Sequence, residues 1–255
     1  ASPVPTPLSI PMICTEAADY FIRLKRVLEK HGKDKVLFLH AHNRFSPFTH
    51  GIGDYWLPGE QYADAITQNP EHFYCENIPA GEYQSAYYTP IHGSGVVFMS
   101  VYQITMWRLK LKENYYAPRY ALSMLTPALL HDMNISNCYI NHKTVERWWI
   151  IKHDINLADA KFHGYWFSGA VRSDSGKVYV SWYEWEKPSP YSRLLIVGNT
   201  GRKEQPAALK IDWKKLGLAP EKAHLHDLWE NREISSLDSL RVKGNNFLLI
   251  GITAK

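Results

Sequence analysis

The stretch Lys35-Val36-Leu37-Phe38-Leu39-His40-Ala41-His42 decides the fold. A short apolar run bounded by polar residues is typical of a buried strand in a parallel sheet. Polar residues that directly follow such a strand lie at its carboxyl end, where α/β barrels keep their chemistry. The pattern therefore predicts that His40 and His42 lie on the functional edge of a parallel sheet, although a structural role for both histidines is the alternative.

The next informative segment is Gly53-Asp54-Tyr55-Trp56-Leu57-Pro58-Gly59-Glu60-Gln61-Tyr62, which places two carboxylates among three aromatic residues. Sugar hydrolysis needs two carboxyl groups, about 5–5.5 Å apart in retaining enzymes and about 6.5–9.5 Å apart in inverting ones. A loop of this length satisfies either distance. Asp54 and Glu60 are thus the candidate catalytic pair, with Tyr55 and Trp56 in the substrate site. The alternative is a polar surface loop with an aromatic anchor.

The composition is that of an ordinary globular protein. The chain has 255 residues, of which 45% are hydrophobic and 21% charged, and a formal net charge of +4. The basic residues are scattered, which disfavours nucleic-acid binding, and no apolar run approaches the length of a membrane span. Nine Trp and sixteen Tyr residues exceed the needs of a core and favour stacking surfaces for carbohydrate.

The cysteines and the N-terminus leave the cellular location open. Cys14, Cys75 and Cys138 match no zinc pattern, and either one disulfide with a free thiol or three buried thiols would fit. His40, His42 and His50 also lack standard zinc spacing, so we predict neither metal nor cofactor. The Pro-rich start is no signal peptide. A mature N-terminus, as in a secreted or periplasmic protein, or a fragment of a longer chain fits better.

The spacing of apolar residues along the sequence changes near residue 160. Before it, apolar residues at helical spacing predict helices over residues 16–31 and from about Pro118. After it, six or seven short segments of alternating polarity, separated by turns, predict an antiparallel sandwich. Residues 178–185 and 223–229 are two of these expected strands. Trp229 is expected in or near its core, and the turn at Gly244-Asn245 on its surface.

The expected fold class is α/β followed by all-β. Residues 1–158 are predicted to form the second half of a (β/α)8 barrel, and residues 159–255 a C-terminal antiparallel β-sandwich. The first region shows only two or three strand–helix steps, whereas a closed barrel takes about 250 residues. We therefore expect a partner for the half-barrel: its missing N-terminal half, on the same protein or on another chain.

A family resemblance supports this division. Residues 194–200, 208–218 and 226–234 resemble the terminal β-sandwich of barrel glycoside hydrolases such as α-galactosidases and amylases, and include Leu216-Gly217-Leu218 and Asp227-Leu228-Trp229. The preceding half is similar to large bacterial glycoside-hydrolase-like proteins. Its matching pieces are His40-Ala41-His42, Asp54 with Gly59-Glu60, Leu130-His131-Asp132, and Lys161-Phe162-His163-Gly164-Tyr165-Trp166.

The resemblance implies a glycoside hydrolase, or the C-terminal part of one, that acts on a poly- or oligosaccharide. A non-catalytic carbohydrate-binding protein with a degenerate barrel is the competing hypothesis. Three further residues are expected to face the sugar cleft: Glu82, His131 and Asp132. Asp212 and Asp227 are expected to have structural roles near turns of the sandwich.

Overall fold

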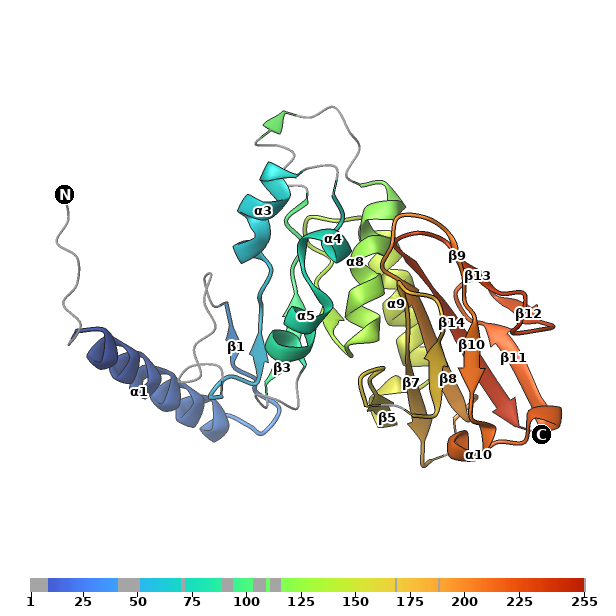
Figure 1. The fold of residues 1–255 in the computed structure, drawn as a ribbon. Helices are drawn as coiled ribbons and strands as arrows, with labels where there is room; N and C mark the ends of the chain where they lie inside the picture. Colours follow the sequence, from blue (N-terminus) through green and yellow to red (C-terminus); the bar gives the residue numbers. More distant parts are fainter. Residues whose placement is uncertain are drawn as a thin grey trace.

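The computed structural model describes residues 9–40, 51–69, 72–88, 94–102, 109–110, 116–167, 169–187 and 189–254. His42, one of the expected substrate-binding residues, lies outside these ranges. The described residues form a mixed α/β structure with one parallel sheet and three antiparallel sheets (Figure 1). None of its helices is long and apolar enough to cross a membrane.

The elements before residue 160 are mostly helices and very short strands. They are α1 (Ser9–Lys30), β1 (Phe38–Leu39), β2 (Tyr55–Trp56), η1 (Glu60–Tyr62), α3 (Ala63–Gln68), α4 (Tyr74–Asn77), α5 (Ala80–Tyr87), β3 (Gly95–Phe98), α8 (Pro118–Leu130), β4 (Asn134–Ile135), α9 (His142–Asp154) and η2 (Leu157–Asp159).

The elements from residue 160 onward are mostly strands. They are β5 (Ala160–His163), β6 (Val171–Ser173), β7 (Val178–Trp185), β8 (Arg193–Asn199), β9 (Gln205–Pro206), β10 (Leu209–Ile211), α10 (Trp213–Leu216), η3 (Pro220–Lys222), β11 (Ala223–Asp227), β12 (Arg232–Ile234), β13 (Arg241–Val242) and β14 (Asn246–Ala254).

The parallel sheet has the order β1-β2-β3-β4, so strands that follow one another in the sequence are neighbours. Phe38 pairs with Tyr55, Tyr55 with Gly95, and Val97 with Asn134. The strand expected over residues 36–40 is shorter in the structure, where β1 comprises only Phe38–Leu39. Because all four strands run the same way, the residues that follow each strand gather at one edge of the sheet.

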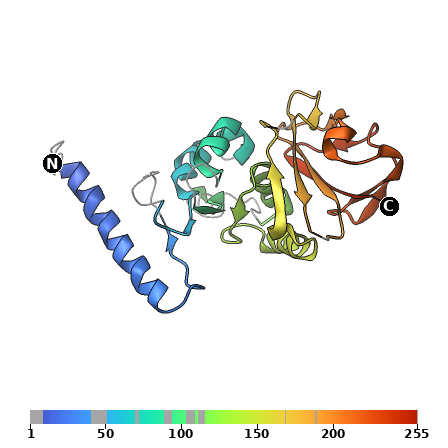
Figure 2. The same ribbon diagram turned by 90° about the horizontal axis from the view of Figure 1, so that it is seen from below.

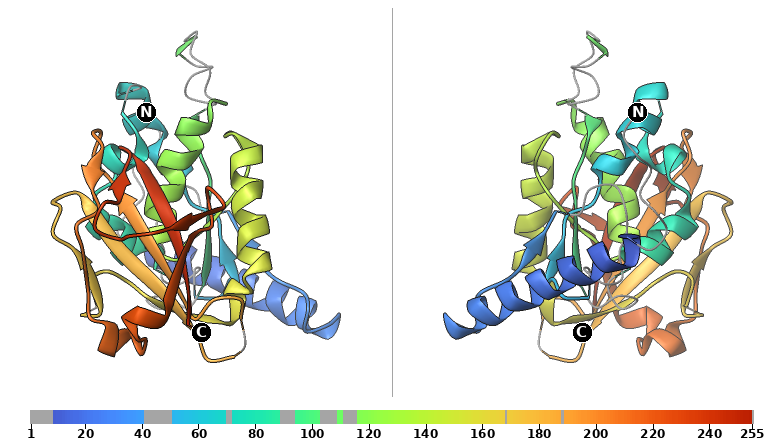
Figure 3. Two further views of the ribbon diagram at one scale, coloured as in Figure 1. Left: turned by 90° about the vertical axis from the view of Figure 1, so that its right-hand side faces the viewer. Right: turned by 90° about the vertical axis from the view of Figure 1, so that its left-hand side faces the viewer.

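Helix α8 lies between the parallel sheet and the largest antiparallel sheet (Figures 1 and 3). Pro118 occupies its first turn, as expected, because proline's missing N–H has no helical partner there. Leu125 and Leu130 are fully buried, and one hydrophobic core joins residues of the parallel sheet, such as Phe98, to residues of the antiparallel sheet, such as Leu249. The two regions therefore share a core, and the boundary at residues 158 and 159 stays a prediction.

The large antiparallel sheet has six strands in the order β12-β11-β14-β8-β7-β5. Strand β7 sends Tyr183 and Trp185 into the core shared with α8, and Val180 and Trp182 into a second core on the other face. Residues from β6, β9–β10 and β13 close that second core. Both faces of the sheet are thus covered.

Two expectations about this region have opposite outcomes. Trp229 is 6% exposed and packs on Phe247, which confirms its predicted burial. The prediction of an exposed Gly244-Asn245 turn is wrong, because Asn245 is also only 6% exposed. Its N–H donates to the Gly201 carbonyl, and a Cβ on Gly244 would lie 1.9 Å from the Arg202 carbonyl oxygen. This turn therefore packs against Gly201 and Arg202, which follow β8.

Helix α1 projects from the body of the molecule (Figure 2). It begins seven residues before the expected residue 16. The Nζ atom of Lys25 donates to the Ile52 carbonyl at 3.1 Å and to Asp54 Oδ1 at 2.9 Å. Tyr20 and Val27 on this helix are 63% and 49% exposed, so part of its apolar surface is uncovered among the described residues.

Candidate functional site

The two expected catalytic carboxylates lie at opposite ends of β2. Asp54 directly precedes the strand, whereas Glu60 follows it and begins η1. The expectation of one continuous loop is therefore wrong, because Tyr55 and Trp56 pair with neighbouring strands on both sides. Main-chain pairing fixes this stretch as strand, and the structure does not bring the two carboxylates together.

Asp54 holds the amino end of the sheet. Its Oδ2 accepts a hydrogen bond from Leu37 N at 2.8 Å, and its Oδ1 accepts from Lys25 Nζ at 2.9 Å. Partial burial would raise the pKa of Asp54, but the hydrogen bonds from Leu37 and Lys25 outweigh burial and hold that pKa below its usual value. The carboxylate is thus charged at neutral pH and links α1, the entry to β1 and the entry to β2.

Glu60 lies at the carboxyl end of the sheet, beside His40. His40 directly follows β1, and its Nε2 is 3.2 Å from Glu60 Oε2. The two side chains are 44% and 32% exposed, so both are in contact with solvent. Because β1 and β2 are adjacent and parallel, the residues after their carboxyl ends lie at the same edge of the sheet. This pair lies on the edge that the sequence pattern predicts.

The turn that carries Glu60 is held by glycine. Gly59 has a φ of 135°, and a Cβ there would lie 1.9 Å from the Met99 carbonyl oxygen. Met99 N in turn donates to the Pro58 carbonyl at 2.8 Å. Only glycine permits this close approach between the segments that follow β2 and β3.

A hydrogen-bond network behind the turn fixes the segment further. Gly59 N donates to Gln61 Oε1 and Gln61 Nε2 donates to the Tyr87 hydroxyl, both at 2.7 Å. The hydroxyls of Tyr62 and Tyr87 are hydrogen-bonded to each other, and Tyr62 also donates to Glu82 Oε1 at 2.5 Å. Burial raises the pKa of both tyrosines, which keeps their hydroxyls protonated as donors.

Glu82, which was expected to face the sugar cleft, belongs to this hydrogen-bond network. The residue lies on α5, and its described contact is with Tyr62 behind the turn. Sequence reasoning missed Gln61, Tyr62 and Tyr87, which connect Glu82 to the Glu60 turn. The available signal was the run of amide and hydroxyl side chains beside Gly59, but their partner on α5 lies more than twenty residues away.

The two expected aromatic residues of the site pack within the fold. Trp56 is 2% exposed and its ring lies 5.6 Å from that of Tyr87. Tyr55 is half-buried, and its ring stacks on Phe38 of the adjacent strand at 5.6 Å. A buried ring presents no face to a sugar, so the expectation that Trp56 contacts substrate is corrected: the residue belongs to the core.

His131 lies at the junction of the two regions and away from the His40–Glu60 edge. It ends α8, is 2% exposed, and its ring stacks near Tyr83 at 5.2 Å and near Trp166 at 5.3 Å. Its Nδ1–H donates to the Pro127 carbonyl at 2.6 Å. Burial lowers the pKa of His131 to about 4, so the imidazole is neutral at pH 7.

Asp132 also lies at the amino end of the sheet, two residues before β4. Its φ of 56° is in the left-handed region, and its Oδ1 accepts from the Tyr183 hydroxyl at 2.7 Å. Burial raises the pKa of Asp132, and the Tyr183 hydrogen bond and the Lys152 charge offset only part of that increase. Asp132 thus ties the end of α8 to β7. His131 packs between Tyr83 and Trp166 and lines a small hollow of about 230 Å³. That the two residues face the sugar cleft stays a prediction.

The two other aspartates that were expected to be structural act as caps of turns. Asp212 Oδ1 accepts from Lys215 N at the start of α10. Asp227 is fully buried, and its Oδ1 accepts from Trp229 N and Glu230 N. Over the described part of the chain, no three His, Cys, Asp or Glu side chains are close enough to hold a metal ion. Cys75 and Cys138 are free thiols.

A comparison with models of known protein families gives a match to the C-terminal part of the chain. Residues 144–252 match the family model of the glycoside hydrolase 123 C-terminal domain. No curated protein matches the chain. The matched segment runs from α9 to β14 and is therefore similar to a domain of a glycoside hydrolase family, whereas His40 and Glu60 lie outside it.

Proposed function

We propose that this chain is part of a glycoside hydrolase whose sugar site lies at the carboxyl ends of the parallel strands. The observation that carries the proposal is the His40–Glu60 pair at that edge, in a chain whose C-terminal segment is similar to a glycoside hydrolase domain. Residues 1–158 would be the second half of a (β/α)8 barrel, and residues 159–255 a β-sandwich packed on it.

The strand order supports the half-barrel. Consecutive parallel strands that lie side by side are the arrangement of a barrel, and an eight-stranded barrel needs further strands beyond these four. Strand β1 is an edge of the described sheet, and Phe38 on it is 47% exposed. The uncovered apolar side chains of β1 and α1 are what a preceding strand–helix unit would cover.

In this proposal Glu60 is one carboxyl group of the acid/base–nucleophile pair that cleaves the glycosidic bond. His40 restrains it from β1 and donates a hydrogen bond to a sugar hydroxyl. Asp54 is not the second carboxyl group, because it lies at the opposite end of β2 and is bound to Lys25 and Leu37 N. The second carboxyl group would follow a strand in the other half of the barrel.

One observation favours a second candidate, a non-catalytic carbohydrate-binding protein. Glu60 is the one expected catalytic carboxylate that the described residues place at the carboxyl edge. A single carboxylate binds sugar hydroxyls but does not by itself supply the two roles that hydrolysis needs.

The two candidates are separated by a paired assay on the intact protein. Hydrolysis of a panel of chromogenic glycosides and binding of the matching oligosaccharides are measured for wild type and for Glu60→Gln, which keeps the side-chain shape and removes the charge. The hydrolase proposal expects kcat to fall about 10²–10⁴-fold while binding is kept. Unchanged hydrolysis would overturn the site, and wild-type binding without hydrolysis would support the second candidate.

A further inference from the structure

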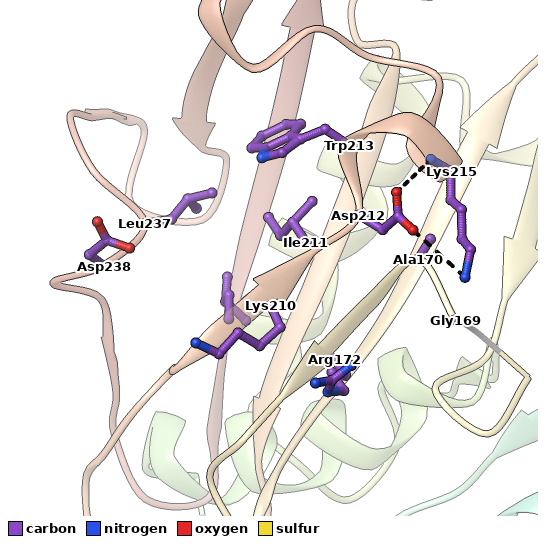
Figure 4. Close-up of a pocket in the computed structure, with 11 residues that line it drawn as sticks. Gly169, Ala170, Arg172, Lys210, Ile211, Asp212, Trp213, Lys215, Leu237 and Asp238 are labelled. Atoms are coloured by element: carbon purple, nitrogen blue, oxygen red, sulfur yellow. Dashed lines mark hydrogen bonds and ion pairs between the residues drawn. The ribbon is translucent and has the colours of Figure 1, made fainter.

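A hollow, referred to below as the groove, lies in the antiparallel region, away from the His40–Glu60 edge. It has a volume of about 740 Å³ and is bordered by β6, β10, the start of α10 and the segment around Leu237 (Figure 4). Neither the family match nor the proposed hydrolytic site assigns a role to it. Its walls combine one aromatic ring, aliphatic side chains and charged groups of both signs.

The apolar part of the hollow contains Trp213, Ile211 and Leu237, which Figure 4 shows near one another. All three side chains are half-buried and pack on the second core, which fixes them in place. Trp213 opens α10, whose first turn is capped by Asp212 and held by the Asp212–Lys215 ion pair at 3.7 Å. The indole is therefore a platform that the capped turn and the second core position.

Charged side chains surround this platform, and their charges nearly balance. Arg172 and Lys210 both lie near Asp174, at 3.4 and 3.9 Å, so the two cations share one carboxylate. Lys215 is compensated by Asp212, and Asp238 adds a further carboxylate on the other side of the hollow. A balanced set of donors and acceptors has little preference for an anion but matches a ring of hydroxyl groups.

We propose that this groove is a non-catalytic binding site for a neutral oligosaccharide. The apolar C–H face of one pyranose stacks on Trp213, because an aromatic ring buries such a face without losing a hydrogen bond. Asp238 accepts from sugar hydroxyls, and Arg172 and Lys210 donate to them. The groove holds a glycan chain while the carboxyl edge of the parallel sheet acts on it, but binding here does not require that Glu60 is catalytic.

The test is isothermal titration of the intact protein with neutral cello-, xylo-, galacto- and chito-oligosaccharides and, for comparison, with oligogalacturonate. Wild type is compared with Trp213→Ala, Trp213→Phe and the double variant Lys210→Ala/Asp238→Asn. Trp149→Ala is the matched control, because Trp149 is 40% exposed on α9 and lies outside the groove. Glu60→Gln is titrated with the same sugars, so that binding is measured without hydrolysis of the titrant; the Trp213 variants then report the part of the binding that belongs to the groove.

The proposal expects a neutral oligosaccharide to bind wild type, Trp149→Ala and Glu60→Gln with the same affinity. Trp213→Ala should weaken binding at least tenfold, Trp213→Phe less, and the double variant several-fold. If Trp213→Ala fails to fold, Trp213→Phe and the double variant, which keep the core packing, decide the result. The proposal is overturned if no neutral sugar binds, if these variants bind like wild type, or if only oligogalacturonate binds.

Discussion

The strands of the parallel and the antiparallel region differ in length and in how completely the rest of the molecule covers them. The parallel strands are two to four residues long, and Phe38 and Val36 beside their edge are 47% and 54% exposed. The antiparallel strands β7, β8 and β14 are eight, seven and nine residues long and are covered on both faces. The antiparallel region closes its second core with its own residues, and its other face packs on α8 in the core that both regions share. The parallel sheet packs on α8, α4 and α5, but its edge strand β1 is partly exposed.

The largest effect is expected from removing the antiparallel region. A chain that ends at residue 158 loses the partners of α8 in the shared core and exposes helix residues that are now fully buried. We expect this fragment to aggregate or to show no cooperative unfolding. Circular dichroism and analytical ultracentrifugation check it. A soluble fragment with a cooperative thermal transition would show that the parallel region does not need the antiparallel one.

The second effect is acid sensitivity of the junction at His131. Burial lowers the pKa of His131 to about 4 from an ordinary value of 6.5. The unfolded chain therefore takes up the proton more readily, and stability that is present above pH 6.5 is lost as the pH falls towards 4. The shift corresponds to about 3 kcal/mol.

The measurement is urea unfolding of wild type and His131→Phe from pH 7.5 to pH 4. Phenylalanine keeps a ring between Tyr83 and Trp166 but does not titrate. The neighbouring Asp132, whose pKa burial raises, is present in both proteins and cancels in the difference. We expect wild type to lose about 3 kcal/mol more than the variant over this range. Parallel pH profiles would contradict a buried, neutral His131.

A smaller effect is expected where α8 crosses β8. A Cβ on Gly198 would lie 2.7 Å from Leu130 Cδ1 and 3.1 Å from Thr126 Cγ2. Gly198→Val should push the helix from the sheet and cost about 2 kcal/mol. Gly176→Ala is the matched control, because a Cβ there meets no atom within 4 Å. Equal unfolding midpoints for the two variants would show that this close contact does not join the regions.

The smallest effect is expected at the amino end of the parallel sheet. Asp54→Asn weakens the bonds to Lys25 and Leu37 N and should lower the free energy of unfolding by about 1 kcal/mol, because the group is partly exposed. Thermal unfolding measures the loss, with Asp34→Asn as control, since that carboxylate pairs with Lys35 on the surface. A loss no larger than in the control would remove Asp54 as a structural link.

The antiparallel region was largely predictable from sequence, because polar and apolar residues alternate within several of its strands. The expected strand over residues 178–185 coincides with β7, and that over residues 223–229 begins with β11. The missed strands β6, β9 and β12 have only two or three residues each, too few to show a period. Asn245 was misplaced because its burial depends on packing against Gly201, which turn propensity does not report.

The candidate site was predictable in part. The position of His40 and Glu60 followed from an apolar run that ends in polar residues, since the carboxyl ends of parallel strands share one edge. The role of Asp54 did not follow, because a two-residue strand between two carboxylates looks like loop in the sequence. Its partner Lys25 lies on a helix 29 residues earlier, at a distance that no local pattern encodes.

The most direct test of the central claim compares Glu60→Gln with Asp54→Asn in the intact protein, with kcat/KM and unfolding free energy measured on the same samples. If the chemistry lies at the carboxyl edge of the parallel sheet, Glu60→Gln should lose at least 10²-fold in kcat/KM and keep its stability. Asp54→Asn should do the reverse and keep its kcat/KM. A stable Asp54→Asn variant that cannot turn over substrate, beside an active Glu60→Gln, would place the chemistry at the opposite end of β2.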